Sequence, residues 1–222
     1  MAIEGGGGGG GSLKKSAYIR LATKADVPVI KLLIEGLAEF EKLMDRVHAT
    51  EAKLEASLFR QPAFLGPTVL ILEIGTPPSS PQQHSSSTTP SEDVFPEKCL
   101  EVSISTEIQD ASSSSFISSK DSSRTVIGFT LFFPNYSTFL AKSGIYIEDL
   151  FVREEYRRQG LGKLLLKTVA QHAALRDLGR VEWSVLDWNV NAIKFYEAMG
   201  AIVQQEWRIC RLAGDALKAY AG

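Results

Sequence analysis

The sequence predicts an α/β (α+β) domain in which helices flank a mixed central β-sheet. Short runs rich in β-branched and aromatic residues alternate along the chain with segments whose apolar residues recur at helical spacing. Two of the strand-like runs follow each other without a helix between them, which indicates a local hairpin rather than a purely doubly wound sheet. The composition agrees, because 44% of the 222 residues are hydrophobic and 23% are charged, as in a folded domain.

The first part of the domain is predicted to contain a short strand and two helices. The strand covers residues 18–21, and Thr23, followed by Asp26 and Pro28, begins the first helix. A second, shorter helix begins at Thr50. Each helix has an apolar stripe at helical spacing, formed by Ile30, Leu33, Ile34 and Leu37 in the first and by Leu54 and Leu58 in the second.

A hairpin with a long insertion follows. Residues 68–74 and 126–133 are rich in β-branched and aromatic residues and are predicted to pair as antiparallel strands. Between them, residues 76–124 are dominated by Ser, Thr and Pro, a composition typical of low-complexity, disordered segments. Within this insertion one short strand is suggested by the alternating residues Leu100, Val102 and Ile104.

The last part of the domain is predicted to alternate strands with helices. A short helix should stop at Gly200, which suits a left-handed position after a helix end. The predicted elements are a strand at 145–152, a helix at 160–178, a strand at 181–186, a helix at 191–199 and strand material at 201–203 and 207–212.

Charge and cysteine content exclude several classes of protein. A net charge of −2 argues against a general nucleic-acid binder, which needs a basic surface to neutralise phosphates. Cys99 and Cys210 form no CxxC pair, and the three histidines show no metal-ligand spacing. We therefore expect no metal site, no disulfide framework and a reducing compartment.

The ends and the hydropathy predict a protein outside membranes. Residues 1–16 contain an unbroken glycine run and are expected to form a flexible leader that resembles neither a signal peptide nor a transit peptide. Nowhere do 18 consecutive apolar residues occur, so no membrane-spanning helix is expected. The domain proper is then 17–222, interrupted by 76–124, and we expect a cytoplasmic protein, with the nucleus as a further possible compartment.

The turn before the long helix has the features of a phosphate-binding site. A strand ends at Val152, a basic turn with two glycines follows, and an amphipathic helix begins, so unpaired backbone N–H groups face an anion at the helix N-terminus. The expected contacts come from Arg157, Arg158, Gln159, Gly160, Leu161, Gly162 and Lys163. The spacing RxxGxG is neither a Walker loop nor GxGxxG, and an ordinary strand–helix connection is the alternative interpretation.

The turn RRQGLG at 157–162 resembles the acetyl-CoA pyrophosphate motif of the GNAT N-acetyltransferases. Further segments resemble the diamine (spermidine/spermine) and thialysine acetyltransferase branch, and VLDWN and YSTF look closer to the thialysine type and to plant ornithine-acetylating enzymes. These segments are 19–23 with Asp26, 40–41, 136–139, 146–152, 185–189, 192–196 and 207–208. The resemblance implies the GNAT fold, acetyl-CoA as co-substrate and a homodimer.

The resemblance also implies roles for single residues. Glu148 would act as the base-like acid or bind the substrate ammonium, and Tyr196 would protonate the departing CoA sulfur. Asn189 would bond the pantetheine arm or cap the helix that follows it, and the two roles are equally compatible with its position. Leu150, Phe151 and Val152 would lie beside the pantetheine, where an irregular strand would offer N–H groups to the thioester carbonyl.

Acids and aromatics at family positions would bind the amine. They are Phe40, Glu41, Asp149, Glu182, Trp183, Ser184 and Glu206. Near the C-terminus the family's Glu-Gly-Trp reads Gln205-Glu206-Trp207, and Ser137 or Thr138 stands where the spermine type has an acid. Fewer acids predict a preference for short or amino-acid amines over long polycations.

We therefore expect an acetyl-CoA-dependent N-acetyltransferase in which the primary amine of ornithine, thialysine, a diamine or a polyamine attacks the thioester directly. The alternatives are a protein lysine or N-terminal acetyltransferase and a catalytically idle CoA-binding interaction module. No nucleic-acid or membrane partner is expected.

Overall fold

The structure, a computed structural model, describes residues 12–77, 95–105 and 108–221. The chain divides into two compact units, one ending at Trp183 and one beginning at Ser184.

The first unit is built on a six-stranded mixed sheet, which confirms the predicted fold class. The strand order is β3-β1-β2-β4-β5-β6, and all neighbours are antiparallel except β5 and β6, which run parallel. The strands are β1 (Ser12–Leu21), β2 (Thr68–Gly75), β3 (Lys98–Ser105), β4 (Thr125–Ser137), β5 (Lys142–Val152) and β6 (Val181–Trp183).

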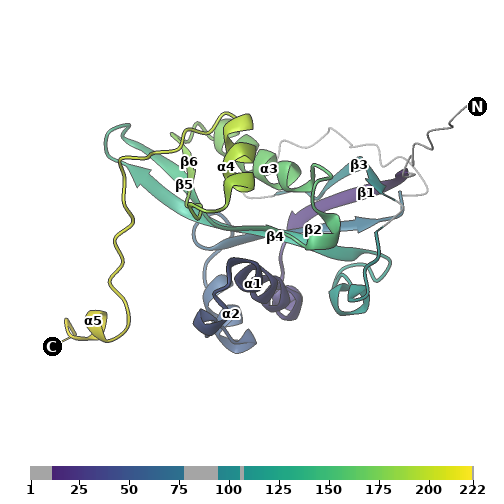
Figure 1. Ribbon diagram of the computed structural model, residues 1–222, viewed down its shortest axis with the longest axis horizontal. Coiled ribbons are helices and arrows are strands. Elements are labelled where there is room, and N and C mark those ends of the chain that lie inside the picture. Colours follow the sequence, from purple (N-terminus) through teal and green to yellow (C-terminus); the bar gives the residue numbers. More distant parts are fainter. Residues whose placement is uncertain (1–11, 78–94, 106–107, 222) are drawn as a thin grey trace, which may run out of the picture. The chain divides into compact units, whose positions relative to one another are not determined.

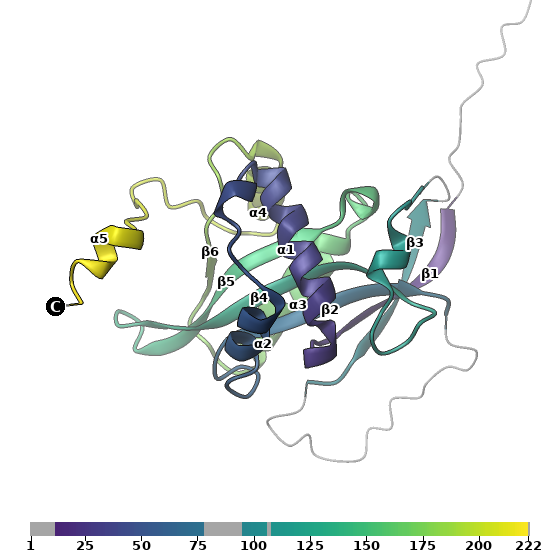
Figure 2. The same cartoon turned by 90° about the horizontal axis from the view of Figure 1, so that it is seen from below.

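Helices cover both faces of this sheet. α1 (Val27–Glu41) and α2 (Glu51–Leu58) lie on one face and α3 (Leu161–Leu175) lies on the other (Figure 1; Figure 2 views the α1 side). Short 3₁₀ helices complete the unit: η1 (Lys24–Asp26), η2 (Met44–Arg46), η3 (Ser113–Phe116) and η4 (Glu154–Tyr156). Within the described residues, no helix combines the length and apolar character needed to cross a bilayer.

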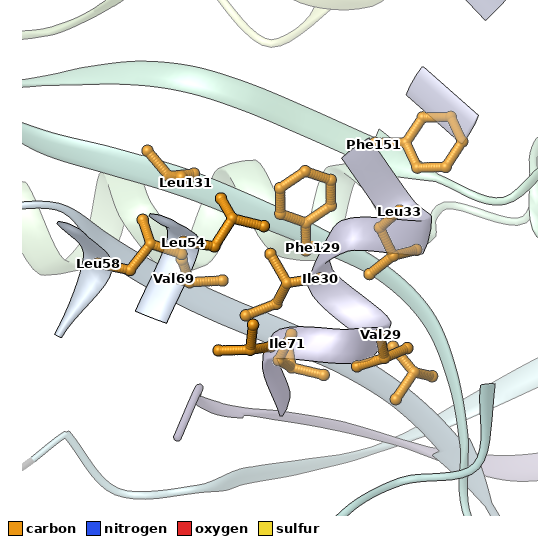
Figure 3. Packing of buried hydrophobic residues seen from close by; sticks show 12 residues of the cluster. Val29, Ile30, Leu33, Leu54, Leu58, Val69, Ile71, Phe129, Leu131 and Phe151 are labelled. Atoms are coloured by element: carbon orange, nitrogen blue, oxygen red, sulfur yellow. The ribbon is translucent and has the colours of Figure 1, made fainter. Parts of the chain in front are cut away.

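The main core lies between α1, α2 and the sheet. The predicted helix stripes supply Ile30, Leu33, Leu54 and Leu58, which pack against strand residues that include Ile71, Phe129 and Phe151 (Figure 3). Thr50 caps α2 as predicted, its hydroxyl accepting a hydrogen bond from the Lys53 N–H at 3.3 Å.

The second unit contains α4 (Val190–Ala198) and α5 (Gly214–Lys218). Gly200 has a φ of 91°, which confirms the predicted left-handed position after α4. The strand material predicted at 201–203 and 207–212 is wrong, because these described residues form no strand, and β6 ends at Trp183 rather than at residue 186. Alternating apolar residues suit a strand but do not provide the partner whose backbone must pair with it.

The predicted hairpin is confirmed, since β2 pairs antiparallel with β4. The inserted segment 76–124 is not a loop throughout, because it contains η3 and the predicted strand, β3. β3 pairs with β1 from Ser12↔Ser105 to Ile19↔Lys98, and this pairing also draws residues 12–16 of the predicted leader into β1. Residues 78–94 and 106–107, and 1–11 of the leader, lie outside the described residues.

A buried ionic cluster ties the inserted segment to the sheet. The Arg20 guanidinium donates to both Asp26 carboxylate oxygens at 2.8 Å and to Glu73 at 2.8 Å. From the inserted segment, Ser118 donates to Glu73 and Ser119 donates to Asp26, each at 2.6 Å.

The pKa values in this cluster follow from its pairing. Burial opposes the charge of Asp26, but hydrogen bonds from Arg20, Ser119 and Thr23 outweigh it and lower the pKa of Asp26. Burial likewise acts against the charged Arg20, but Asp26 and Glu73 raise its pKa overall. Both groups therefore remain ionised inside the protein at neutral pH.

Replacing Arg20 with methionine (Arg20→Met) should lower the free energy of unfolding by about 3–5 kcal/mol, because buried Asp26 loses its cation and Glu73 keeps only Arg124, at 3.4 Å. Urea denaturation at pH 7 measures this loss. The control Lys24→Met removes an exposed pair with Glu55 and should cost less than about 1 kcal/mol. Equal losses of unfolding free energy in the two variants would show that the buried cluster stabilises the protein no more than the exposed ion pair does.

Candidate active site

One extra residue in β5 interrupts its pairing with β4. Leu131 lies opposite Asp149 and Phe132 lies opposite Ile147, so Glu148 is an additional residue on β5, forming a β-bulge. The irregularity in this strand therefore lies at Glu148, whereas residues 150–152, where it was expected, pair regularly with β4.

The other side of β5 opens at the same place. β6 pairs with β5 only from Ile145↔Val181 to Ile147↔Trp183, and β6 then ends. β5 continues to Val152, so its residues 149–152 pair with β4 but not with β6. A bulge next to a strand edge that lacks a neighbouring strand leaves backbone N–H and C=O groups available to a ligand.

The bulge also decides which way the site residues face. Cross-strand partners share a face, and Leu131 and Phe129, the partners of Asp149 and Phe151, belong to the core under α1. Asp149 and Phe151 therefore face α1. Leu150 and Val152 alternate with them and face α3, as shown by their side chains lying 3.9 Å from the position that a Cβ on Gly162 would take.

Two further carboxylates, those of Glu148 and Glu41, act on Asp149. Glu41 is the last residue of α1, Asp149 lies partly buried on β5, and Glu148 is exposed beside it. Burial, followed by the negative charges of Glu148 and Glu41, raises the pKa of Asp149 to about 7. Burial also raises the pKa of Glu41. Such a cluster attracts a cation and can take up a proton near neutral pH.

The turn between β5 and α3 has the backbone of an anion site. Arg158 and Gly160 adopt left-handed conformations, with φ of 62° and 76°. Gly160 caps α3, and the first hydrogen bond inside the helix runs from the Leu164 N–H to the Gly160 carbonyl at 3.1 Å. The amides of residues 161–163 therefore have no acceptor within the helix, and the exposed Lys163 adds positive charge.

Arg157, a predicted phosphate ligand, makes contacts within the protein that the sequence did not predict. Its Nε donates to the Val152 carbonyl at 2.8 Å, and its guanidinium lies 4.6 Å from the Phe40 ring centre and 5.3 Å from that of Phe151. These contacts hold the end of β5 against α1. Arg157 therefore shapes the site through packing, whereas Arg158 is exposed.

Other predicted residues of the first unit have structural contacts. Glu182 accepts a hydrogen bond from the Asn135 side chain at 2.7 Å and pairs with Arg180 at 2.8 Å, so its negative charge is already balanced. Trp183 is the last residue of β6 and lies opposite Ile147. Leu161 is buried at the start of α3, and Gln159 accepts a hydrogen bond from the Ser105 backbone at 2.9 Å.

Tyr196, Asn189, Ser184 and Glu206 belong to the second unit. Asn189 caps α4, its Oδ1 accepting from the Ala192 N–H at 3.2 Å, so one of its two predicted roles is present. Tyr196 lies on α4, and its ring centre is 5.2 Å from that of Phe195. Ser184 is the first residue of the unit and Glu206 lies in a turn.

A polar network beside the turn was not predicted from the sequence. Arg153 and Tyr156 both donate to Asp110, a residue of the inserted segment. The serine-rich composition around Asp110 gives no sign of this contact, because it depends on a partner far along the chain. Among the described residues no group of His, Cys, Asp or Glu side chains has the arrangement of a metal site.

The chain is similar to known acyltransferases. The profile of the Acetyltransferase (GNAT) family matches residues 81–201. The chain is 52% identical to L-ornithine N5-acetyltransferase NATA1 of Arabidopsis thaliana, over 90% of this chain and 86% of that protein. It is 35% identical to tyramine N-feruloyltransferase 4/11 of Nicotiana tabacum (91% and 90%) and 31% identical to thialysine N-epsilon-acetyltransferase of Bos taurus (92% and 96%).

Solved structures share the fold. An integron cassette protein of V. cholerae superposes with a TM-score of 0.56 at 20% identity, covering 92% of this chain and 97% of that one. An aminoglycoside acetyltransferase from a soil metagenome gives a TM-score of 0.54 at 15% identity, with coverages of 89% and 97%.

The Asp149 carboxyl group should titrate with a midpoint near pH 7, as measured by carbon-13 NMR. Glu41→Gln should lower this midpoint, because one repelling negative charge is removed. Glu39→Gln, on an exposed residue of the same helix, should leave it unchanged. An Asp149 midpoint near the ordinary value of about 3.9 would contradict the electrostatic coupling.

The same shift has a consequence for stability. The folded state holds the Asp149 proton up to about pH 7, whereas the unfolded chain releases it near pH 4, so the free energy of unfolding falls as pH rises through this range. Asp149→Asn removes this effect and should make the protein more stable than wild type at pH 8, in urea denaturation.

Proposed function

The chain belongs to the Acetyltransferase (GNAT) family and is an amine N-acetyltransferase; we propose that its substrate is a small primary amine of the ornithine kind. The observation that carries the substrate proposal is the carboxylate cluster of Glu41, Glu148 and Asp149 beside the β5 bulge. A protonated amine is a cation, and three neighbouring acids lower its free energy there. The likeness to the ornithine-acetylating relative supports the same class.

The residues of the turn fit the coenzyme. Acetyl-CoA, the acetyl donor of the family, supplies an activated thioester. Its diphosphate would be held by the first-turn amides of α3, with Arg158 and Lys163 adding charge, and the open space beside Gly160 leaves room for this approach. The strand edge at 148–152 would hold the pantetheine, and an N–H group there would polarise the thioester carbonyl.

Two proton transfers complete the proposed reaction. A lysine-like amine has an unperturbed pKa near about 10.4 and must lose a proton before it attacks. Asp149, with a pKa of about 7, is the acceptor proposed here, while Glu148 contributes charge and binds the ammonium. Tyr196 is proposed to donate a proton to the departing sulfur, a role supported by its position in the WNxxAxxFY segment after Asn189.

An amine panel tests the substrate class. With acetyl-CoA, the purified protein should release free thiol in the presence of ornithine, thialysine or a short diamine, and more slowly with spermine and with lysine-containing peptides. Tyramine with feruloyl-CoA is a necessary arm, given the feruloyltransferase relatives. The proposal would be refuted if thiol were released only with peptides, or if none of the amines led to thiol release.

Tyr196→Phe tests the proton donor. This variant should lower kcat by about 10²-fold or more while changing the KM for the amine little, because the hydroxyl acts only when the sulfur departs. Tyr220→Phe, at the exposed end of the same unit, is the matched control and should retain full turnover. Unchanged kcat in Tyr196→Phe would remove this assignment and leave the substrate class intact.

A further inference from the structure

The connection between β5 and α3, residues 153–160, is held in place by residues from a distant part of the chain. It begins with Arg153, continues through η4 and ends at Gly160, the cap of α3. Its last residues form the turn proposed to hold the coenzyme phosphates. The residues that fix it belong to the inserted segment between β2 and β4.

Asp110 is the main contact. Both terminal nitrogens of Arg153 donate to its carboxylate, one of them at 2.8 Å, and the Tyr156 hydroxyl donates to it at 2.8 Å. The side chains of Arg153 and Asp110 are only 5% and 7% exposed. Ser112 and Phe116 complete the enclosure, Ser112 accepting from Arg153 at 2.7 Å and the Phe116 ring lying 3.8 Å from the guanidinium.

A second contact reaches the turn itself. The backbone N–H of Ser105, at the end of β3, donates to the Gln159 side chain at 2.9 Å. The inserted segment thus binds the connection near both of its ends, at Arg153 and at Gln159.

These contacts matter because the turn has an unfavourable backbone. Arg158 is not glycine, yet its φ is 62°, a conformation that L-residues adopt at a cost. A turn that is already fixed loses no conformational entropy when the ligand binds. Its affinity for the ligand is therefore higher than that of a turn that must first become ordered. Arg153 is fully engaged with protein groups, which include the Val126 carbonyl at 3.3 Å, and its role is therefore to position rather than to bind phosphate.

We propose that Asp110 is a positioning residue that sets the affinity for acetyl-CoA by fixing Arg153 and Tyr156 at the base of the phosphate-binding turn. This gives residues 110–116 of the serine-rich insertion a role in binding the coenzyme. The inference rests on the proposed function, since it requires that the turn holds the coenzyme.

Asp110→Asn is the central variant, because asparagine keeps the shape and removes the charge. The KM for acetyl-CoA should rise about tenfold while kcat at saturating substrates is unchanged. With S-acetylpantetheine, which lacks the nucleotide and its phosphates, kcat/KM should equal that of wild type. A general loss of structure would affect both donors alike.

Two further variants make the test specific. Tyr156→Phe removes one hydrogen bond to Asp110 without changing the charge. It should also raise the KM for acetyl-CoA, but by a smaller factor than Asp110→Asn. Ser119→Ala removes a 2.6 Å hydrogen bond from the same inserted segment to Asp26, away from the turn, and should leave this KM unchanged.

Calorimetry with coenzyme A separates failure of this inference from failure of the proposed function. If wild type binds coenzyme A and Asp110→Asn binds it equally well, the positioning role is refuted and the proposed function stands. The role is also refuted if the variant loses activity equally with acetyl-CoA and S-acetylpantetheine. If wild type does not bind coenzyme A, the proposed function fails and this inference fails with it.

Discussion

A single extra residue in β5, Glu148, decides which face of the sheet Asp149 and Phe151 occupy in the candidate site. Strand residues alternate between faces, so an inserted residue exchanges the faces of everything that follows it. Without the bulge, Asp149 would share the α3 face with Ile147; with it, Asp149 faces α1 and the charge of Glu41. The pairing of β6 with β5 ends at Ile147, one residue before the bulge at Glu148. The irregular backbone therefore lies where β5 is no longer paired with β6. The negative charges of the carboxylates and the backbone N–H groups of this strand edge therefore lie at the same place.

The inserted segment stabilises this arrangement from outside. Ser118 and Ser119 complete the buried cluster around Arg20, and Asp110 completes the one around Arg153. In each cluster an arginine has its charge balanced by acids in a poorly solvated environment, where loss of one partner costs far more than loss of an exposed pair. The described residues of this segment thus add hydrogen bonds to both clusters: Ser118 and Ser119 donate to acids that Arg20 also binds, and Asp110 binds Arg153.

Local patterns predicted local structure well. Thr50, the α1 stripe and the left-handed Gly200 depend on neighbours in sequence, and the structure confirms them. The β2–β4 pairing is also confirmed, although the inserted segment 76–124 separates the two strands. Features that depend on distant partners were missed or misjudged. The bulge depends on the register of β5 with β4, the hydrogen bond of Glu182 depends on Asn135, and the packing of Arg157 depends on Phe40. The strand material predicted at 201–203 and 207–212 is wrong, because a local run of residues does not specify a pairing partner.

The carboxylate cluster meets two requirements that oppose each other. An arriving ammonium is stabilised by the negative charges of Glu41, Glu148 and Asp149, and its own charge favours the ionised form of Asp149. Tight binding would therefore lower the basicity on which the proposed role of Asp149 as proton acceptor depends. Burial of Asp149 and the negative charges of Glu148 and Glu41 act in the opposite direction, because they raise its pKa. A longer polycation would bring more positive charge to the cluster, tighten binding and reduce that basicity further, which argues on electrostatic grounds for a substrate with few amines.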